Sequence, residues 1–249
     1  MFKAVPAASP DISQALVINF STHTFKVRGA IGSLLLSQLA NTDMSLNIQP
    51  SLEEIDANLK DVQERREKLI KGSRDVVMLC SKSIVAMHHG RHEDAAKDTL
   101  QARAMLDDLR GYAKQDLCRY IAVAEQELVE AQALSAVMTN STIPSMRDAG
   151  VSGESYLTGL LDCVGEIKRL VFDRMRSGST RDAERLFLVM EEIYGTVYPF
   201  AIYDNIIPGL RKKLDLARML IEDIRAVVTE ESRRKAMMDA IDKLEKRTG

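Results

Sequence analysis

Apolar residues recur along most of the chain at alternating intervals of three and four, the spacing of a buried stripe on an α-helix. The longest stripe runs from Leu52 to Met87 and predicts a first helix from residue 52 to about residue 90. At about 1.5 Å per residue, this helix would be more than about 50 Å long. Such a length is unusual in an isolated globule and favours a bundle or an assembly.

The rest of the pattern predicts six more helices. They cover residues 93–114, 116–138, 154–176, 181–194 and 209–229, and the tail that follows. Pro144 and two glycines predict a loop over 140–153, and residues 198–208 predict an irregular link. The absence of Trp, the 5% aromatic content and the few Gly and Pro residues agree with an all-α bundle of seven helices with a long first helix.

The first 43 residues differ from this helical body. They are rich in Ser and Ala and poor in acids, and they predict a poorly ordered extension (1–43) before a helical domain (44–249). No run approaches the roughly 20 apolar residues that span a bilayer, so no membrane association is expected. Three cysteines without C-x-x-C spacing predict buried thiols in a reducing compartment, which indicates a cytoplasmic protein.

Two predicted helices each carry a pair of acids one turn apart. Glu127 and Glu130 lie in QELVEA, and Asp162 and Glu166 lie in YLTGLLDCVGE. Residues three or four apart lie side by side on a helix, so four carboxylates would converge if the two helices face each other. Such a set suits Mg²⁺, with Mn²⁺ as a substitute, because hard cations take oxygen ligands. Helical di-iron sites use Glu-x-x-His pairs, and no histidine is near either pair in the sequence.

The faces of the two helices leave alternatives open for both pairs. Glu127 and Glu130 flank an apolar stripe, where a charge is costly unless a metal or a Lys or Arg from another helix neutralises it. Glu125 is expected on the opposite, solvated side. The second pair is expected away from the apolar stripe of its helix, where a solvated face with a weak ion pair between Glu166 and Arg169 is the alternative to a metal site.

Other polar groups are less informative. His88, His89 and His92 cluster at the end of the first helix and are interpreted as capping or solvent residues, because cations suit a helix C-terminus. The chain has no phosphate-binding glycine motif and no nucleophile paired with a base, which disfavours covalent catalysis.

The net charge of -2 argues against a broad basic surface, although local basic groups occur. Such groups are usually solvated, but along a cavity they would bind phosphates. The candidate nucleic-acid-binding residues are Lys68, Lys71, Lys82, Arg211 and Lys212.

Four segments together resemble the translin family, in particular the branch of translin-associated factor X and its archaeal relatives. These segments are REKLIKGSRDVVMLCSKSIVAMHHG, QELVEA, YLTGLLDCVGEIKRL and GLRKKLDLARMLIEDIR, and the resemblance covers residues 52 to 230. It implies a seven-helix translin-like fold, a hollow octamer-like shell that binds RNA inside, and magnesium-dependent endoribonuclease activity. The family's active acids map onto Glu127, Glu130, Asp162 and Glu166.

The resulting hypothesis is an endoribonuclease in which metal-activated water attacks a phosphodiester of single-stranded or short duplex RNA. Glu130 is the candidate general base. One alternative is a non-catalytic shell that binds single-stranded RNA or DNA, and another is an all-α nucleotide pyrophosphohydrolase, which also uses paired acids for Mg²⁺. A homo-oligomer is expected, and the sequence leaves open whether a second, translin-like subunit joins it.

Overall fold

The computed structural model describes residues 48–248. The predicted extension, residues 1–43, lies outside this range. The chain divides into two units at residue 57, and the described part of the first unit, residues 48–57, contains the beginning of one long helix. The packing discussed below is that of residues 58–248.

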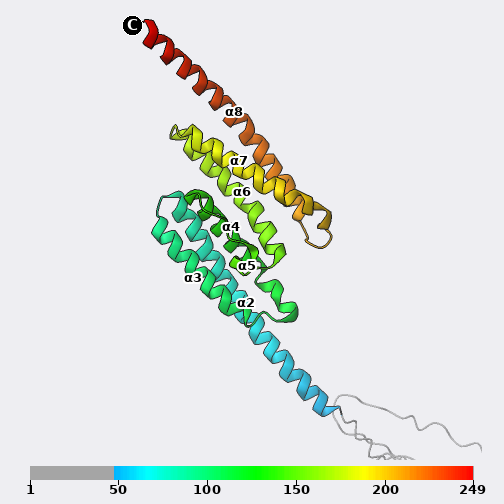
Figure 1. The fold of residues 1–249 in the computed structure, drawn as a ribbon. Coiled ribbons are helices and arrows are strands. Elements are labelled where there is room, and N and C mark those ends of the chain that lie inside the picture. Colours follow the sequence, from blue (N-terminus) through cyan, green and yellow to red (C-terminus); the bar gives the residue numbers. More distant parts are fainter. Residues whose placement is uncertain (1–47, 249) are drawn as a thin grey trace, which may run out of the picture. The chain divides into compact units, whose positions relative to one another are not determined.

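Helices account for all the regular structure between residues 48 and 248 (Figure 1). The α-helices are α2 (Gln49–His88), α3 (His92–Arg110), α4 (Ala122–Thr139), α5 (Met146–Ala149), α6 (Gly153–Arg176), α7 (Thr180–Val197) and α8 (Leu210–Thr248), and the 3₁₀-helices are η1 (Gln115–Tyr120) and η2 (Tyr198–Tyr203). The seven α-helices in the described range confirm the predicted fold class. The first helix is also as long as expected, with 40 residues.

Three predicted boundaries were wrong. The third predicted helix begins as η1, and α4 starts only at Ala122. The predicted loop contains the short helix α5, which Ser145 and Asp148 close with reciprocal capping hydrogen bonds. The two predicted C-terminal helices are one helix, α8, because no Gly or Pro interrupts residues 210–248 and only the buried stripe ends, near Val228.

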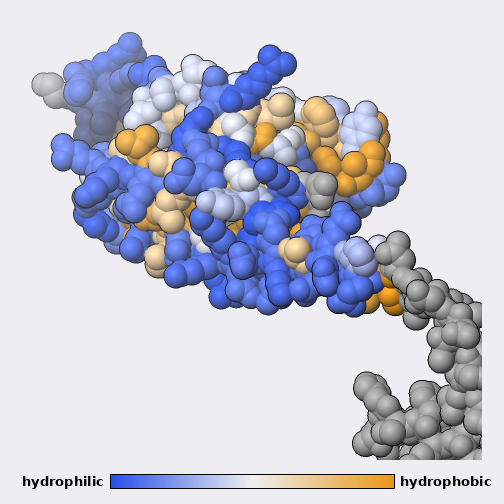
Figure 2. Space-filling view, turned by 90° about the horizontal axis from the view of Figure 1, so that it is seen from below, coloured by the Kyte–Doolittle hydropathy of each residue, from blue (hydrophilic) through white to orange (hydrophobic). Residues whose placement is uncertain are grey.

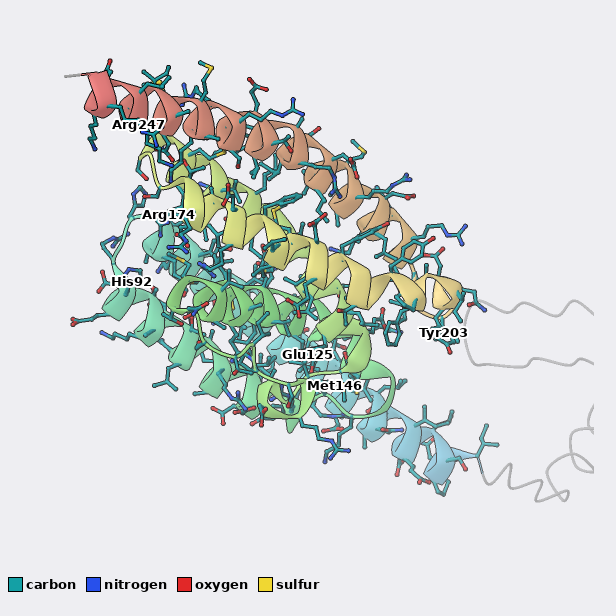
Figure 3. The ribbon with its side chains drawn as sticks, turned by 45° about the horizontal axis from the view of Figure 1, so that its top comes forward. His92, Glu125, Met146, Arg174, Tyr203 and Arg247 are labelled. Atoms are coloured by element: carbon teal, nitrogen blue, oxygen red, sulfur yellow. The ribbon has the colours of Figure 1, made fainter. Side chains whose placement is uncertain are left out.

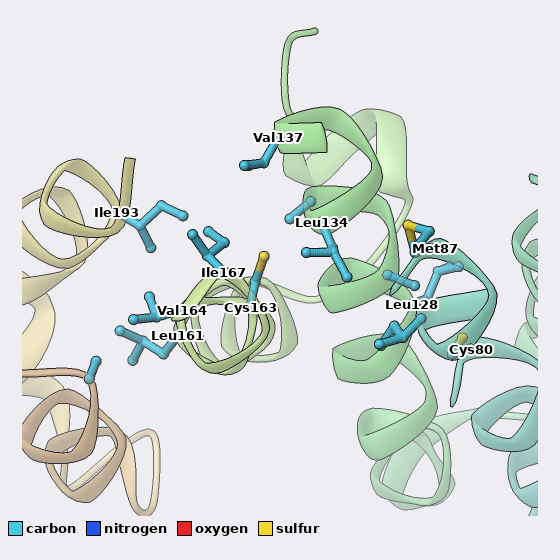
Figure 4. Packing of buried hydrophobic residues seen from close by; sticks show 14 of the residues in the cluster. Cys80, Met87, Leu128, Leu134, Val137, Leu161, Cys163, Val164, Ile167 and Ile193 are labelled. Carbon is cyan, nitrogen blue, oxygen red and sulfur yellow. The ribbon is translucent and has the colours of Figure 1, made fainter. Parts of the chain in front are cut away.

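Helix α6 has a central place in the bundle, because it packs against α4, α7 and α8. Figure 4 shows Leu161 and Val164 of α6 pointing away from α4. On the other side of α4, its Leu128 meets Cys80 and Met87 of α2 in the same apolar core. The core therefore holds α2, α4 and α6 in fixed order, with α4 between the other two.

Gly159 allows α4 and α6 to approach closely. A Cβ atom at this position would lie 2.5 Å from the carbonyl oxygen of Gln126 and 2.8 Å from Cβ of Val129. Only glycine avoids these overlaps, since it has no side chain. The close contact lies one turn before Asp162 on α6 and next to Glu127 on α4, so it brings the two acidic segments together.

The surface of the described chain is mixed. Hydrophilic residues cover most of the face in Figure 2, and apolar patches interrupt them. Seven large apolar side chains are more than 60% exposed, namely Leu59, Leu100, Leu188, Ile202, Ile206, Met219 and Met237. None of the helices described here is both long enough and apolar enough to cross a membrane.

Candidate functional site: an acidic cluster between α4 and α6

The four predicted acids lie on facing helices and act on one another. Glu127 and Glu130 come from α4, Asp162 and Glu166 come from α6, and all four side chains are partly buried. Burial raises the pKa of Glu130 to about 8, and the charges of Glu127, Asp162 and Glu166 contribute further to this shift. The structure therefore brings the two pairs into one electrostatic cluster.

The α4 pair has no donor to stabilise its charge. Burial is the main cause that raises the pKa of Glu127, followed by the charge of Asp162. No side chain in the described range donates a hydrogen bond to Glu127 or Glu130, although Lys213 acts on both through its charge. Partly buried carboxylates without donors are unstable as anions, so they favour either a proton or a bound cation.

Asp162 has two partners from other helices. Gln126 Nε2 of α4 donates a 2.6 Å hydrogen bond to one of its oxygens. The ammonium group of Lys213, from α8, forms a close ion pair with the other. The sequence analysis considered a Lys or Arg from another helix as the partner of Glu127 and Glu130. In the structure that cation is Lys213, and it pairs with Asp162 of α6 instead.

Glu166 is bonded to a histidine, which the sequence analysis did not anticipate. His88 Nε2 lies 2.5 Å from Glu166 Oε2, and the His88 side chain is only 1% exposed. This hydrogen bond is the largest cause that lowers the pKa of Glu166. The interpretation of His88 as a capping or solvent residue was therefore wrong. Helix α2 packs in the core up to its last turn, so its final residue turns inward towards α6.

Two buried thiols also lie next to the acids. Burial raises the pKa of Cys80 to about 12, and the charges of Glu127 and Glu130 add to the effect. Burial also raises the pKa of Cys163 well above its ordinary value. Both thiols are therefore neutral and form an uncharged, apolar side of the cluster. The prediction of buried thiols is confirmed for these two residues and was wrong for Cys118, which is exposed.

Glu125 was expected on a solvated face, and this prediction was wrong. Its side chain is buried, the backbone N–H of Ser152 donates a 3.1 Å hydrogen bond to it, and Arg110 Nε lies 3.7 Å away. Figure 3 shows Glu125 within the bundle. The segment from α5 to the start of α6 covers this side of α4, which the periodicity of α4 alone cannot show.

The acids fit a hard divalent cation by donor type and charge, because four partly buried carboxylates face a single nearby lysine. They are not pre-assembled around one. Within residues 48–248, no three His, Cys, Asp or Glu side chains are placed to hold a metal ion together. Gln126 and Lys213 occupy both oxygens of Asp162 in this arrangement, so Asp162 would have to exchange a partner when a cation binds.

The five basic residues predicted to bind nucleic acid do not contact the acids. All five are exposed, namely Lys68, Lys71, Lys82, Arg211 and Lys212. The basic residue that contacts the acids is Lys213, which pairs with Asp162. The sequence analysis missed it because no motif distinguishes Lys213, and only its position on the helix indicates where it points. It lies between the buried residues Leu210 and Leu214 and therefore at the border of the packed face of α8.

Comparison with known proteins gives a consistent result. The Translin family profile matches residues 112–230, which include all four acids. The protein MJ0175 of Methanocaldococcus jannaschii is 30% identical over 160 residues, which are 63% of this chain and 72% of the relative.

Solved structures show the same fold. The crystal structure of AfC3PO is 31% identical with a TM-score of 0.70, and the match covers 75% of this chain and 99% of that one. A structure of AfC3PO in complex with duplex RNA is 30% identical with a TM-score of 0.69, over 75% and 98% of the two chains. The apo form of NeC3PO, at 22% identity and a TM-score of 0.63, covers 73% of this chain and 97% of its own and shares the fold.

Proposed function

Because this chain belongs to the translin family, we propose that it is a magnesium-dependent endoribonuclease that cleaves single-stranded or short duplex RNA inside an oligomeric shell. The observation that carries the proposal is the cluster of four partly buried carboxylates, which holds more negative charge than Lys213 offsets. The AfC3PO complex with duplex RNA supports RNA as the substrate class.

The acids divide into ligands and a base in this proposal. Glu127, Asp162 and Glu166 would hold the cation, and Glu130 would accept the proton of the attacking water. Bound Mg²⁺ supplies a Lewis acid that acidifies water and offsets charge on the phosphate and the leaving oxygen. A pKa of about 8 in the cation-free protein makes Glu130 a stronger base than an ordinary carboxylate, and a nearby cation lowers this value towards neutrality.

Lys213 and His88 have supporting roles. The ammonium group of Lys213 puts a positive charge beside Asp162, which attracts a phosphodiester to a site that is otherwise anionic. His88 fixes the orientation of Glu166 through their hydrogen bond. Hydrogen-bonded partners of this kind hold metal-binding carboxylates in place.

The exposed apolar side chains support a homo-oligomer larger than a dimer, of the octamer-like kind. Monomers rarely expose large apolar patches, and such patches usually mark interfaces. Light scattering at micromolar concentration tests this point. A monomer of 27.8 kDa would contradict the shell, while a mass raised by a second, translin-like chain would show a hetero-oligomer.

An assay with labelled single-stranded RNA, duplex RNA and nucleoside triphosphates, each with Mg²⁺ or EDTA, tests the activity. Internal cleavage of RNA that EDTA abolishes is the expected result. RNA or single-stranded DNA that binds without cleavage would instead support a binding shell. Release of pyrophosphate from triphosphates with intact RNA would support the pyrophosphohydrolase.

A further inference from the structure

A single ammonium group acts on carboxylates from two helices. Lys213 of α8 forms a close ion pair with Asp162 of α6. Its positive charge also acts on Glu127 and Glu130 of α4, where it opposes the rise in their pKa values that burial causes. Lys213 therefore offsets part of the negative charge that attracts a metal ion to this cluster.

Both oxygens of Asp162 have partners. Gln126 Nε2 donates a 2.6 Å hydrogen bond to Oδ2, and Lys213 Nζ pairs with Oδ1. A neutral amide can share a carboxylate with a metal ion, because each carboxylate oxygen has more than one lone pair. An ammonium group at the same carboxylate repels a divalent cation, and it has no lone pair with which to become a ligand. Lys213 and a divalent cation therefore compete for Asp162.

Lys213 can leave Asp162, but α8 offers it no other acid. Its side chain is 29% exposed and ends a flexible four-carbon stem. The residues three and four positions away are uncharged, namely Gly209, Leu210, Leu216 and Ala217. Asp215 pairs with Arg218, and the two residues before Lys213 are exposed cations. A displaced ammonium group would therefore meet like charges on its own helix, and an anion from outside the chain would stabilise it.

A phosphodiester is an anion of the required kind. An ammonium group binds phosphate as a point charge, without the fixed geometry that a guanidinium group needs. In the proposed function, the phosphate to be cleaved lies at the cation and therefore beside Asp162. The RNA backbone thus offers Lys213 a new partner at the place where the cation removes the old one.

We propose that Lys213 is a phosphate-binding residue whose contact with RNA depends on the cation. Lys213 pairs with Asp162 until a divalent cation takes this carboxylate, and it then binds the RNA backbone. Cation and RNA consequently strengthen each other's binding, by the same factor in both directions. This inference rests on the proposed function and deepens it, because it names the residue that couples the two ligands of the site.

Fluorescence anisotropy of the full chain with fluorescein-labelled, single-stranded phosphorothioate RNA, which resists hydrolysis, compares binding in Mn²⁺ and in EDTA. Lys213→Met keeps an unbranched stem and removes the charge. In Mn²⁺ it is expected to weaken RNA binding about tenfold and to lower the slope of log affinity against log salt by about one, because a phosphate contact is lost. In EDTA it should leave affinity and slope nearly unchanged. Equal weakening in both conditions would overturn the proposal.

Mn²⁺ binding without RNA provides a second measurement, made by electron paramagnetic resonance of the free ion. Lys213→Met is expected to bind Mn²⁺ about fivefold more tightly than the unmodified protein, because the competitor for Asp162 is gone. Lys212→Met is the matched control, since it removes the same charge from an exposed neighbouring position, and its effect should be smaller. Unchanged or weaker Mn²⁺ binding by Lys213→Met, or an equal gain in Lys212→Met, would overturn the competition.

Asp162→Asn gives a test that needs no cation. The substitution removes the charge that holds Lys213, so the ammonium group should be available to RNA even in EDTA. Adding Lys213→Met is then expected to weaken RNA binding in the Asp162→Asn protein, although it does not do so in the unmodified protein. Equal effects in both proteins would overturn the proposal. If melting curves show that Lys213→Met is unfolded, Lys213→Gln, which can still donate a hydrogen bond to Asp162, takes its place in every measurement.

The outcomes distinguish this proposal from the proposed nuclease. Absence of Mn²⁺ binding to the unmodified protein would overturn both. Mn²⁺ binding and cleavage of ordinary RNA, with equal effects of Lys213→Met in Mn²⁺ and EDTA, would overturn the role of Lys213 alone. An effect of Lys213→Met that appears only in Mn²⁺, without any cleavage of ordinary RNA, would retain the coupling and overturn the nuclease.

Discussion

Glu125 and Glu130 lie on one helix, less than two turns apart, and their surroundings differ sharply. Glu125 is buried with a backbone N–H donor from Ser152 and an arginine close by. Glu130 is less buried, but it has no donor in the described range and it faces three other carboxylates, so its pKa rises to about 8. A carboxylate with partners holds the fold together, whereas a carboxylate without partners is available to a ligand.

The largest expected effect comes from three acids of the cluster between α4 and α6. Glu127→Gln, Glu130→Gln and Asp162→Asn should each reduce magnesium-dependent RNA cleavage by about 100-fold or more, because each removes charge from the proposed cation site. Single-turnover cleavage with saturating RNA measures the effect. Asp173→Asn is the matched control, since Asp173 lies on α6 three turns after Asp162 and pairs with the exposed Arg176. Full activity of the three variants would place catalysis elsewhere.

The next effect concerns the contact that brings the two acidic segments together. Gly159→Ala would place a methyl group 2.5 Å from the Gln126 carbonyl, so α4 and α6 must separate. We expect a loss of about 1–3 kcal/mol in the free energy of unfolding, measured with urea, together with weaker cleavage by the folded protein. Gly165→Ala on the same helix is the control, because its nearest contact would be at an ordinary 3.9 Å. Equal stability of both variants would contradict this account of the helix contact.

Glu125→Gln is expected to have the opposite effect to substitutions of the cluster acids, with lower stability and unchanged cleavage. The amide keeps one acceptor for the Ser152 N–H but loses the charge near Arg110, so the free energy of unfolding should fall by about 1–3 kcal/mol. Cleavage per folded molecule should stay unchanged. Urea titration and an assay normalised to folded protein measure the two quantities. Loss of cleavage without loss of stability would assign Glu125 to the site.

The last prediction is a pH dependence of the melting temperature in EDTA. The pKa of Glu130 in the folded protein is about 8, above its ordinary value of 4.5, so the folded state keeps a proton that the unfolded state releases. The resulting stability is fully present below about pH 4.5 and disappears as the pH rises through about 8. The melting temperature should fall over this range and fall less in Glu130→Gln. Identical profiles would show that Glu130 titrates normally.

The fold was largely predictable because it depends on local patterns. Apolar spacing located the main helices, and the same stripe continues through α2 almost to its end. The errors occurred where a boundary depends on contacts with other segments. The short helix α5 forms over residues that look like a loop, and α8 continues as a helix after its buried stripe ends near Val228.

The candidate site was predictable in part. Paired spacing identified Glu127 and Glu130, because neighbours on one helix are set by the geometry of that helix. The partners of these acids were not predictable in the same way. Lys213 and His88 reach the cluster from helices that are 83 and 42 residues away from Glu130 along the chain, and neither lies in a motif that marks a ligand.

The sequence by itself determined the main helices and the pairing of the acids on each helix, because these follow from periodicity and residue type. Only the tertiary structure decided which acids have partners. Burial of Glu125 depends on the segment that covers α4, and the bond between His88 and Glu166 depends on where the last turn of α2 lies relative to α6. The ionisation of a carboxylate follows from the groups around it, and those groups are brought together by the fold.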